Sequence, residues 1–166
     1  MIRAVKYTDA SQLADIYNYY VMFGTATFET EAVSADEMAN RIQKIEGNSL
    51  PWIVAEDQRG SIIGYAYASK WKERHAYRHS VEITVYLDKN HRSQGLGSKL
   101  YAALFAHLKS ISVHVAIAGI ALPNETSIAL HEKFAMKKVA HFAEVGNKFG
   151  KWVDVGYWQL VLNTMK

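Results

Sequence analysis

The fold of this chain is decided by the stretch Val81-Glu82-Ile83-Thr84-Val85-Tyr86-Leu87 and by His91-Arg92-Ser93-Gln94-Gly95-Leu96-Gly97-Ser98, which follows it closely. The first part alternates apolar residues with others, which predicts a strand over residues 80–87. The second part places two glycines before a helical repeat of apolar residues from Leu96 to Ile111. Glycine lets the backbone approach an anion closely, and the first turn of a helix has amides without internal partners. The sequence therefore predicts a diphosphate site at this turn.

Two common phosphate loops do not match the turn. A Walker loop needs Gly-x-x-x-x-Gly-Lys-Ser/Thr, whereas Ser98 and Lys99 follow Gly97 in the wrong order. A dinucleotide fingerprint needs a third glycine where Leu100 stands. The remaining spacing, Gln/Arg-x-x-Gly-x-Gly/Ala after a strand, is matched by Arg92, Gly95 and Gly97. It resembles the acetyl-CoA motif of the GNAT superfamily of N-acetyltransferases.

The composition predicts one domain over residues 1–166. A hydrophobic content of 49% and a charged content of 21% suit a single buried core. The net charge of +3 and the pI near 9.0 favour anionic ligands such as coenzyme A. No basic run of five residues occurs, so we expect no nucleic-acid partner.

The chain contains no cysteine. Disulfides, thiolate zinc sites and an acyl-cysteine intermediate are therefore excluded. The N-terminus lacks a signal-like apolar region, and no stretch of about 18 apolar residues occurs. We expect a soluble, cytoplasmic protein with no membrane partner.

Periodicity and turn residues predict the element order β-α-α-β-β-β-α-β-α-β-β. Helix starts are predicted at Asp9, at the Ser34-x-x-Glu37 capping box and at Asn124. Strands are predicted at residues 1–6, 52–56, 61–70, 80–87, 113–118, 139–145 and 152–162, the last two joined by a link over 146–150. The order matches an α/β (α+β) GNAT fold, with a mixed, mostly antiparallel central sheet flanked by helices.

Further stretches resemble the phosphinothricin N-acetyltransferase branch of that superfamily over nearly the full chain. They are Ile16-Tyr17-Asn18, Phe28-Glu29-Thr30-Glu31, residues 51–56 and 64–68, Trp71-Lys72-Glu73-Arg74 with Ala76-Tyr77, the Glu82 strand, Pro123-Asn124, Ser127, Leu130-His131-Glu132 and residues 149–160. The resemblance implies acetyl-CoA as cosubstrate and, as acceptor, the amine of phosphinothricin, methionine sulfoximine or methionine sulfone.

Glu82 is the candidate general base. A carboxylate inside a largely apolar strand is uncommon in packing, and partial burial would raise its pKa toward the working pH. The resemblance implies the same role, acting directly or through water. The alternative is a surface carboxylate on a half-exposed strand.

Candidate cofactor contacts follow from the strand, the turn and the next helix. The backbone of Val85, Tyr86 and Leu87 is expected to hold the pantetheine arm like an added strand. The expected pyrophosphate contacts are the amides of Ser93, Gln94, Gly95, Leu96, Gly97 and Ser98. Arg92 either pairs with phosphates or shields the turn, and Asn124 either touches the cofactor or only caps its helix.

His131 stands where many acetyltransferases carry a tyrosine that protonates the coenzyme A sulfur. The resemblance implies that it acts as that acid or binds substrate, and the alternative is a structural histidine. His75 and His79 lie four residues apart, but no third ligand is evident, so we expect no metal site.

An acceptor with an α-carboxylate and a second anionic or strongly polar group needs cations and donors around an apolar stem. The candidate substrate contacts are Phe28, Lys72, Glu73, Arg74, Tyr77 and Thr84, with Arg78 as a further cation. Arg74 is the preferred carboxylate ligand, whereas Lys72 and Arg78 equally fit a surface charge cluster.

The favoured function is amino-acid N-acetylation by direct transfer in a ternary complex. Acetylation of a polyamine, an aminoglycoside or a protein N-terminus is a rival, although the basic stretch over residues 72–78 disfavours such cationic acceptors. A second rival function is that of a non-catalytic acetyl-CoA sensor. Trp152, Tyr157 and Trp158 in the last predicted strand suggest a homodimer built on the C-terminal hairpin, although core packing explains the same aromatic residues.

Overall fold

The computed structural model describes residues 1–92 and 95–162. It contains strands β1 (Ile2–Ala4), β2 (Trp52–Glu56), β3 (Ile62–Lys70), β4 (Ser80–Leu87), β5 (Val115–Leu122), β6 (Lys137–Lys148) and β7 (Lys151–Val161). The helices are α1 (Ala10–Phe23), α2 (Ala35–Gly47), α3 (Leu96–Ser110) and α4 (Glu125–Lys133), with short 3-10 turns at Tyr7–Asp9 and His75–Tyr77. The element order predicted from the sequence is confirmed.

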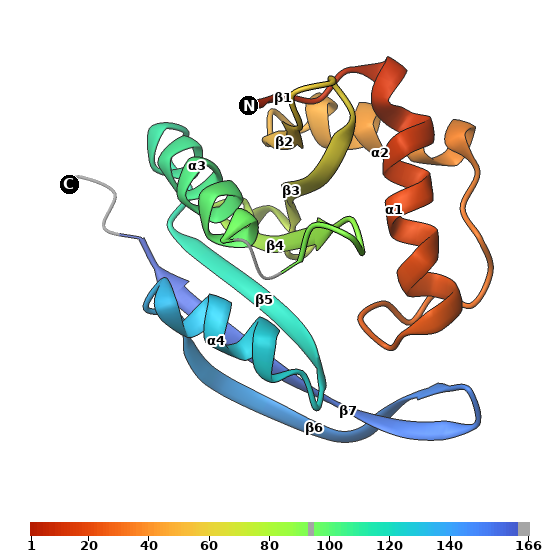
Figure 1. Cartoon of the computed structure of the whole chain (residues 1–166). Coiled ribbons are helices and arrows are strands. Elements are labelled where there is room, and N and C mark those ends of the chain that lie inside the picture. Colours follow the sequence, from red (N-terminus) through yellow and green to blue (C-terminus); the bar gives the residue numbers. More distant parts are fainter. Residues whose placement is uncertain (93–94, 163–166) are drawn as a thin grey trace.

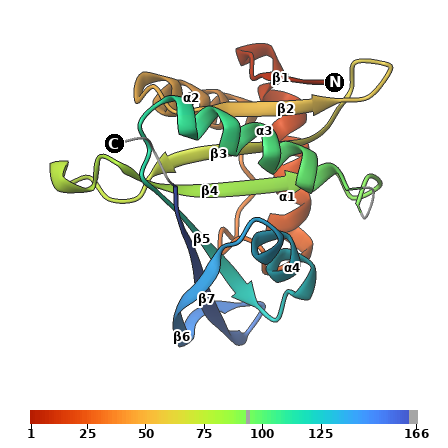
Figure 2. The same ribbon diagram turned by 90° about the vertical axis from the view of Figure 1, so that its left-hand side faces the viewer.

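The strands form one sheet in the order β1-β2-β3-β4-β5-β7-β6. Every neighbouring pair is antiparallel except β4 and β5, which run parallel. Their pairing stops at Glu82 and Ile117, although the two strands continue to Leu87 and Leu122. Figure 2 shows β4 and β5 diverging beyond this point. The sheet is therefore split along one seam.

Helices cover both faces of the sheet (Figure 1). On one face α3 packs on β2, β3 and β4, and on the other α1 packs on β3 and β4 while α2 packs on β2. The predicted stripe of α3 is confirmed, because Leu100, Leu104 and Leu108 are fully buried. On the opposite face, Leu13 and Ile42 are equally buried. No helix in the described ranges is long and apolar enough to cross a bilayer.

Two of the three predicted helix caps form. The Ser34 hydroxyl accepts a hydrogen bond from the N–H of Glu37 at 3.1 Å at the start of α2. At the start of α4, the Asn124 side-chain oxygen accepts one from the N–H of Ser127. At the third, α1 begins after Asp9 as predicted, but the expected cap bond is wrong, because the Asp9 carboxylate makes none to α1. It instead accepts the N–H of Lys6 at 2.7 Å and a bond from the Arg3 guanidinium at 2.8 Å. A nearby cation thus draws this carboxylate away from the helix start.

The C-terminal hairpin is longer than its sequence suggests. The predicted link over residues 146–150 is wrong, because β6 continues to Lys148 and only Phe149 and Gly150 form the turn. Both have positive φ angles, 54° and 69°, as a two-residue type I′ hairpin turn requires. The register of β6 shifts between Phe142 and Gly146, which marks a bulge. The fifth strand also differs, running over 115–122 rather than 113–118.

Candidate active site

A cavity of about 690 Å³ lies where β4 and β5 diverge. Its walls come from the end of α1, from β4, the start of α3, β5 and α4. They include Tyr20, Thr27, Glu82, Thr84, Val85, Tyr86, Leu87, Arg92, Gly95, Leu96, Gly97, Ser98, Tyr101, Gly119, Asn124, His131 and Lys133. Val85 packs toward α3 and Tyr86 toward α1, so the cavity reaches both faces of the sheet.

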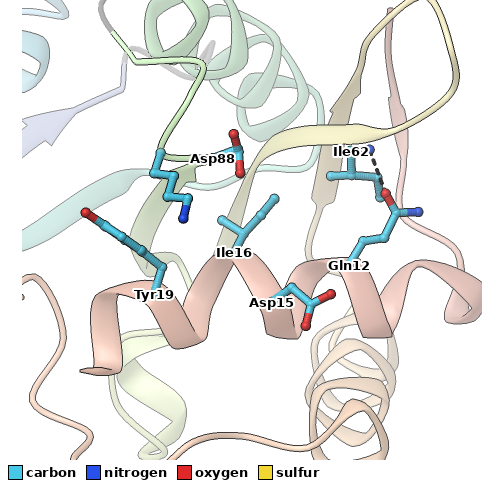
Figure 3. A pocket seen from close by; sticks show the side chains of 7 residues that line it. Gln12, Asp15, Ile16, Tyr19, Ile62 and Asp88 are labelled. Atoms are coloured by element: carbon cyan, nitrogen blue, oxygen red, sulfur yellow. Dashed lines mark hydrogen bonds between the residues drawn. The ribbon is translucent and has the colours of Figure 1, made fainter. Parts of the chain in front are cut away.

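A smaller hollow of about 330 Å³ lies between α1, β3 and the end of β4 (Figure 3). The side-chain amide oxygen of Gln12, in the wall of this hollow, already accepts a hydrogen bond from the backbone N–H of Ile62 at 2.9 Å. The hollow carries the carboxylates of Asp15 and Asp88, with Lys89 as the cation beside them. Two acids beside one lysine disfavour an anionic ligand. The larger cavity is therefore the candidate site.

Glu82 lies on β4 at the point where pairing with β5 ends. Its side chain is half-buried, and burial raises the pKa of this carboxyl while the charge of Lys72 acts in the opposite direction. Gly119 of β5 lies beside it, since a Cβ there would stand 3.5 Å from Glu82 Oε1. A carboxylate with a raised pKa in a cavity is suited to accept a proton.

The main chain of β4 divides its hydrogen-bonding groups between two sides. Bonds from Asp88 N–H to Ile63 and from Trp71 N–H to Ser80 fix which residues pair with β3. Hydrogen-bonded pairs alternate along an antiparallel ladder, so the main chain of Tyr86 faces β3, whereas that of Val85 and Leu87 faces the seam. The Leu87 carbonyl there accepts the Tyr20 hydroxyl at 2.5 Å. The backbone N–H and C=O groups of Val85 therefore also face the seam.

The glycine turn precedes α3 as the sequence predicts. Gly95 has φ +72°, a left-handed conformation that favours glycine. A side chain at Gly97 would meet Leu130 Cδ2 at 3.2 Å, so glycine permits α4 to approach α3. Ser93 and Gln94 lie outside the described residues. The backbone at the start of α3 is thus open to a ligand in the cavity.

Two cations flank this turn. The Arg92 guanidinium lies 5.0 Å from the centroid of the Tyr19 ring and 5.1 Å from that of Tyr20. On the other side the Lys133 ammonium donates to the Ser98 hydroxyl at 3.0 Å. Sequence reasoning missed Lys133, although a lysine in the last turn of the helix after Asn124 was a usable signal. The pair makes the mouth of the cavity electropositive.

His131 is buried, and both ring nitrogens are engaged. Nδ1 lies 2.6 Å from the Ser127 carbonyl oxygen, which only accepts, so Nδ1 carries the hydrogen. Nε2 then accepts the Tyr101 hydroxyl at 2.9 Å. Burial lowers the pKa of His131, opposed by the bond to Ser127. The imidazole is therefore neutral near pH 7, and Tyr101 is a wall residue that sequence reasoning missed.

The candidate substrate residues separate in space. Thr84 lines the cavity, and the Phe28 ring packs on Gly146 of β6, where an added Cβ would clash with the ring. Lys72, Glu73, Arg74 and Tyr77 are exposed on the segment between β3 and β4, and the described lining of the cavity includes none of the four. Glu73 pairs with Lys70 at 3.8 Å. Of these four, Lys72 is the residue that acts on Glu82.

Across residues 1–92 and 95–162, no three His, Asp or Glu side chains are grouped so that they could hold a metal ion. His75 and His79 stay on the exposed segment before β4, and His79 Nδ1 lies 3.1 Å from the Ser112 carbonyl. The polar groups in the described cavity lining include those of Glu82, Thr84, Tyr101, the glycine turn and the α4 residues.

Residues 2–156 match the family model described as Acetyltransferase (GNAT) domain. The chain belongs to the GNAT family of acetyltransferases.

Its relatives include a phosphinothricin N-acetyltransferase of Streptomyces viridochromogenes, 37% identical over 95% of this chain and 85% of the relative. An L-amino acid N-acyltransferase of Escherichia coli is 35% identical over 98% and 94%. An L-methionine sulfoximine/L-methionine sulfone acetyltransferase of Salmonella typhimurium is 33% identical over the same shares. The crystal structure of a phosphinothricin acetyltransferase from Sinorhizobium meliloti in complex with AcCoA has a TM-score of 0.96 and 35% identity, covering 100% of this chain and 91% of that one.

Proposed function

We propose that this protein transfers an acetyl group from acetyl-CoA to the α-amino group of a small amino-acid-like substrate, of the phosphinothricin, methionine sulfoximine or methionine sulfone type. One observation carries the proposal. The half-buried carboxylate of Glu82 lies in a cavity that opens on the glycine turn at one side of the sheet and on α1 at the other. The names of the relatives and the AcCoA complex of a similar structure support this assignment.

The donor side suits coenzyme A in shape and charge. The seam-facing groups of Val85 are in place to pair with the amides of a pantetheine arm, as an added strand would. The amides from Gly95 to Ser98 and the cations Arg92 and Lys133 suit phosphates. Asn124 caps α4 and also lines the cavity. When bound, acetyl-CoA supplies the thioester carbonyl that the amine attacks.

The acceptor side suits an amine. An ammonium group must lose a proton before it attacks a thioester, and a carboxylate with a raised pKa accepts that proton more readily. Glu82 meets this requirement directly or through a water molecule. Transfer occurs in a ternary complex, since the chain has no cysteine to carry the acetyl group. Lys72, Arg74 and Tyr77 are the proposed carboxylate-binding set, with Phe28 and Thr84 as walls.

The proposal gives His131 a positioning role. Its neutral form accepts the Tyr101 hydroxyl and has no hydrogen on Nε2 to give to a departing thiolate. The lowered pKa keeps the ring in this form. His131 therefore orients Tyr101 at the cavity wall, which favours that role over general acid catalysis.

The test is Glu82→Gln. Loss of a general base should lower kcat/KM by about 10²- to 10⁴-fold, while calorimetry should find acetyl-CoA affinity within about twofold of wild type. Asp15→Asn removes a carboxylate from the smaller hollow and is the matched control, with unchanged kinetics expected. Unchanged turnover in Glu82→Gln would remove Glu82 from the mechanism.

The proposal includes a cytoplasmic homodimer joined through the C-terminal hairpin. Val145, Phe149 and Trp152 expose 58%, 58% and 66% of their surface there, whereas Trp158 belongs to the core. β6 is the last strand in the sheet order, and an apolar sheet edge needs cover. A second copy of the chain would supply it. Sedimentation equilibrium should find a dimer that Trp152→Ser weakens, and a wild-type monomer would contradict this part.

A further inference from the structure

The segment between α1 and α2 forms part of the cavity wall. Residues 24–33 adopt neither helix nor strand, yet Ala26 and Thr27 line the large cavity beside Tyr20 of α1. An irregular segment keeps its place only through the contacts that it makes with neighbouring elements. The contacts of this wall segment, residues 24–33, therefore set the shape of the cavity on the side of α1.

The second half of the wall segment is fixed by side chains of α1 and α2. Asn18 of α1 bonds both main-chain groups of Val33, at 2.7 and 2.8 Å. The Glu29 carboxylate accepts two bonds from the Arg41 guanidinium of α2, at 2.5 and 3.0 Å, and one from the Tyr17 hydroxyl. These ties come after the two residues that line the cavity.

The first half of the segment is held by Lys148, the last residue of β6. The far end of the β6–β7 hairpin lies beside the end of α1 (Figure 1). The Lys148 ammonium donates to the Thr27 carbonyl at 2.8 Å and to the Tyr20 carbonyl at 3.3 Å. A further bond to this half, from the Tyr86 hydroxyl to the Ala26 carbonyl, is longer, at 3.4 Å. Lys148 thus makes the shortest of these bonds to the main chain of the cavity wall.

Two features compensate the burial of this ammonium. Lys148 exposes only 2% of its surface, and a buried charge is costly unless hydrogen bonds or an opposite charge balance it. One of its carbonyl partners belongs to Tyr20 in the last turn of α1, where the helix dipole favours a cation. Burial lowers the pKa of Lys148, and the charge of Glu29 opposes this. The cation and the wall segment therefore stabilise each other.

Lys148 acts on the wall from outside the cavity. The described lining of the cavity does not include it, so it has no direct contact with a ligand there. The same strand also holds the Phe28 ring, which packs on Gly146, two residues before Lys148. The end of β6 thus supports the wall segment at two successive residues, Thr27 and Phe28.

We propose that Lys148 is a positioning residue for the acceptor. It holds the main chain at Thr27 in place, so that the cavity keeps the shape in which the acceptor's amine faces Glu82. The glycine turn and Lys133 lie on the other side of the sheet, so acetyl-CoA binding does not depend on Lys148. This inference rests on the proposed function and adds a residue of the C-terminal hairpin to its acceptor site.

Steady-state kinetics of Lys148→Met test the role. The change removes the ammonium and keeps a long, unbranched side chain. The acceptor is whichever of phosphinothricin, L-methionine sulfoximine and L-methionine sulfone the wild type uses best. Its KM should rise about tenfold, the scale of a lost hydrogen bond to a charged group, while the KM for acetyl-CoA stays within about twofold. A merely structural role would reduce the amount of folded enzyme, and so the apparent kcat, without changing either KM.

Hydrogen exchange measured by mass spectrometry reports on the wall segment directly. Amides of residues 24–33 should exchange about tenfold faster in Lys148→Met, while those of α3 keep the wild-type rate. Lys137→Met makes the same charge change at an exposed residue of β6 and should alter neither exchange nor KM. Lys148→Gln, which keeps an amide donor, replaces the Met variant with the same expectations if the latter does not fold.

The outcomes separate this inference from the function on which it rests. A folded Lys148 variant with an unchanged acceptor KM would overturn the inference, as would an equal rise in the KM values of acceptor and acetyl-CoA. Wild-type protein that binds acetyl-CoA and acetylates no amino acid would refute the proposed function, and the inference with it.

Discussion

Gly119→Ala tests whether the close approach of Tyr157 and the Glu82 carboxylate to the bare backbone at Gly119 controls the chemistry. The added Cβ would lie 3.0 Å from Tyr157 Cε1 and 3.3 Å from its Cζ. Carbon atoms pack best at about 3.5–4.0 Å, so the ring must move by roughly 0.5–1 Å. Overpacking costs about 1–3 kcal/mol, and the half-exposed Tyr157 can yield toward solvent, which places the cost near the lower end of that range. The melting temperature should therefore fall by only about 2–4 °C.

The effect on catalysis should be much larger. A displacement of about 1 Å near the reacting groups lowers the rate by about 10²-fold, so we expect a fall of that order in kcat/KM. Thermal melting and steady-state kinetics at saturating acetyl-CoA measure the two effects on one preparation. Gly47→Ala is the control, because a Cβ at this helical position meets nothing within 4 Å. It should leave kcat/KM unchanged and hold or raise the melting temperature. A Gly119→Ala enzyme with kcat/KM within twofold of wild type would refute the reasoning.

Three further predictions concern stability. Burial opposes ionisation of Asp9, but the hydrogen bonds from Arg3 prevail and lower its pKa. Asp9→Asn should therefore lower the free energy of unfolding by about 1–3 kcal/mol at pH 7. Urea unfolding should find that this loss shrinks below about pH 4, because the wild-type carboxylate is then protonated. Because the pKa of His131 is lowered in the folded protein, the unfolded chain binds the proton more readily, and the stability of the wild type should decrease below about pH 6.5. His131→Gln keeps an acceptor for the Tyr101 hydroxyl and should flatten that decrease in urea unfolding. Gly150→Ala forces a φ of +69° on a residue with a Cβ and should cost about 1–2 kcal/mol in thermal melts; an unchanged melting temperature would contradict the strain.

The fold was predictable because its signals are local. The spacing of Leu100, Leu104 and Leu108 specifies one face of α3, and the Ser34 box specifies the start of α2 without any tertiary information. Failures arose where a side chain outside the predicted helix intervened, as when Arg3 binds the carboxylate of Asp9. The hairpin was misjudged because Phe149 adopts a positive φ that its residue type does not suggest.

The candidate site was likewise predictable where the signal lies within one element and not where it depends on contacts between elements. Glu82 and Gly95 were identifiable because a carboxylate in an apolar strand and a glycine before a helix are visible in a short window. The pairing of Tyr101 with His131 was not, since the two residues lie 30 positions apart in sequence and on different helices. The ring contacts of Tyr157 with Trp71 and Phe142 depend on β7 lying between β5 and β6, which only the assembled sheet provides. Chemistry within one element was predictable, whereas chemistry across elements was not.

Under the proposed function, the seam between β4 and β5 would give the donor and the acceptor separate entrances to the cavity. Because the cavity passes from one side of the sheet to the other, we expect the nucleotide to come and go past α3 and α4 while the amine uses the opposite entrance. Residues that shape the amine's entrance can then change while the grip on the nucleotide is kept, so a scaffold of this kind can acquire new acceptors without rebuilding its donor half.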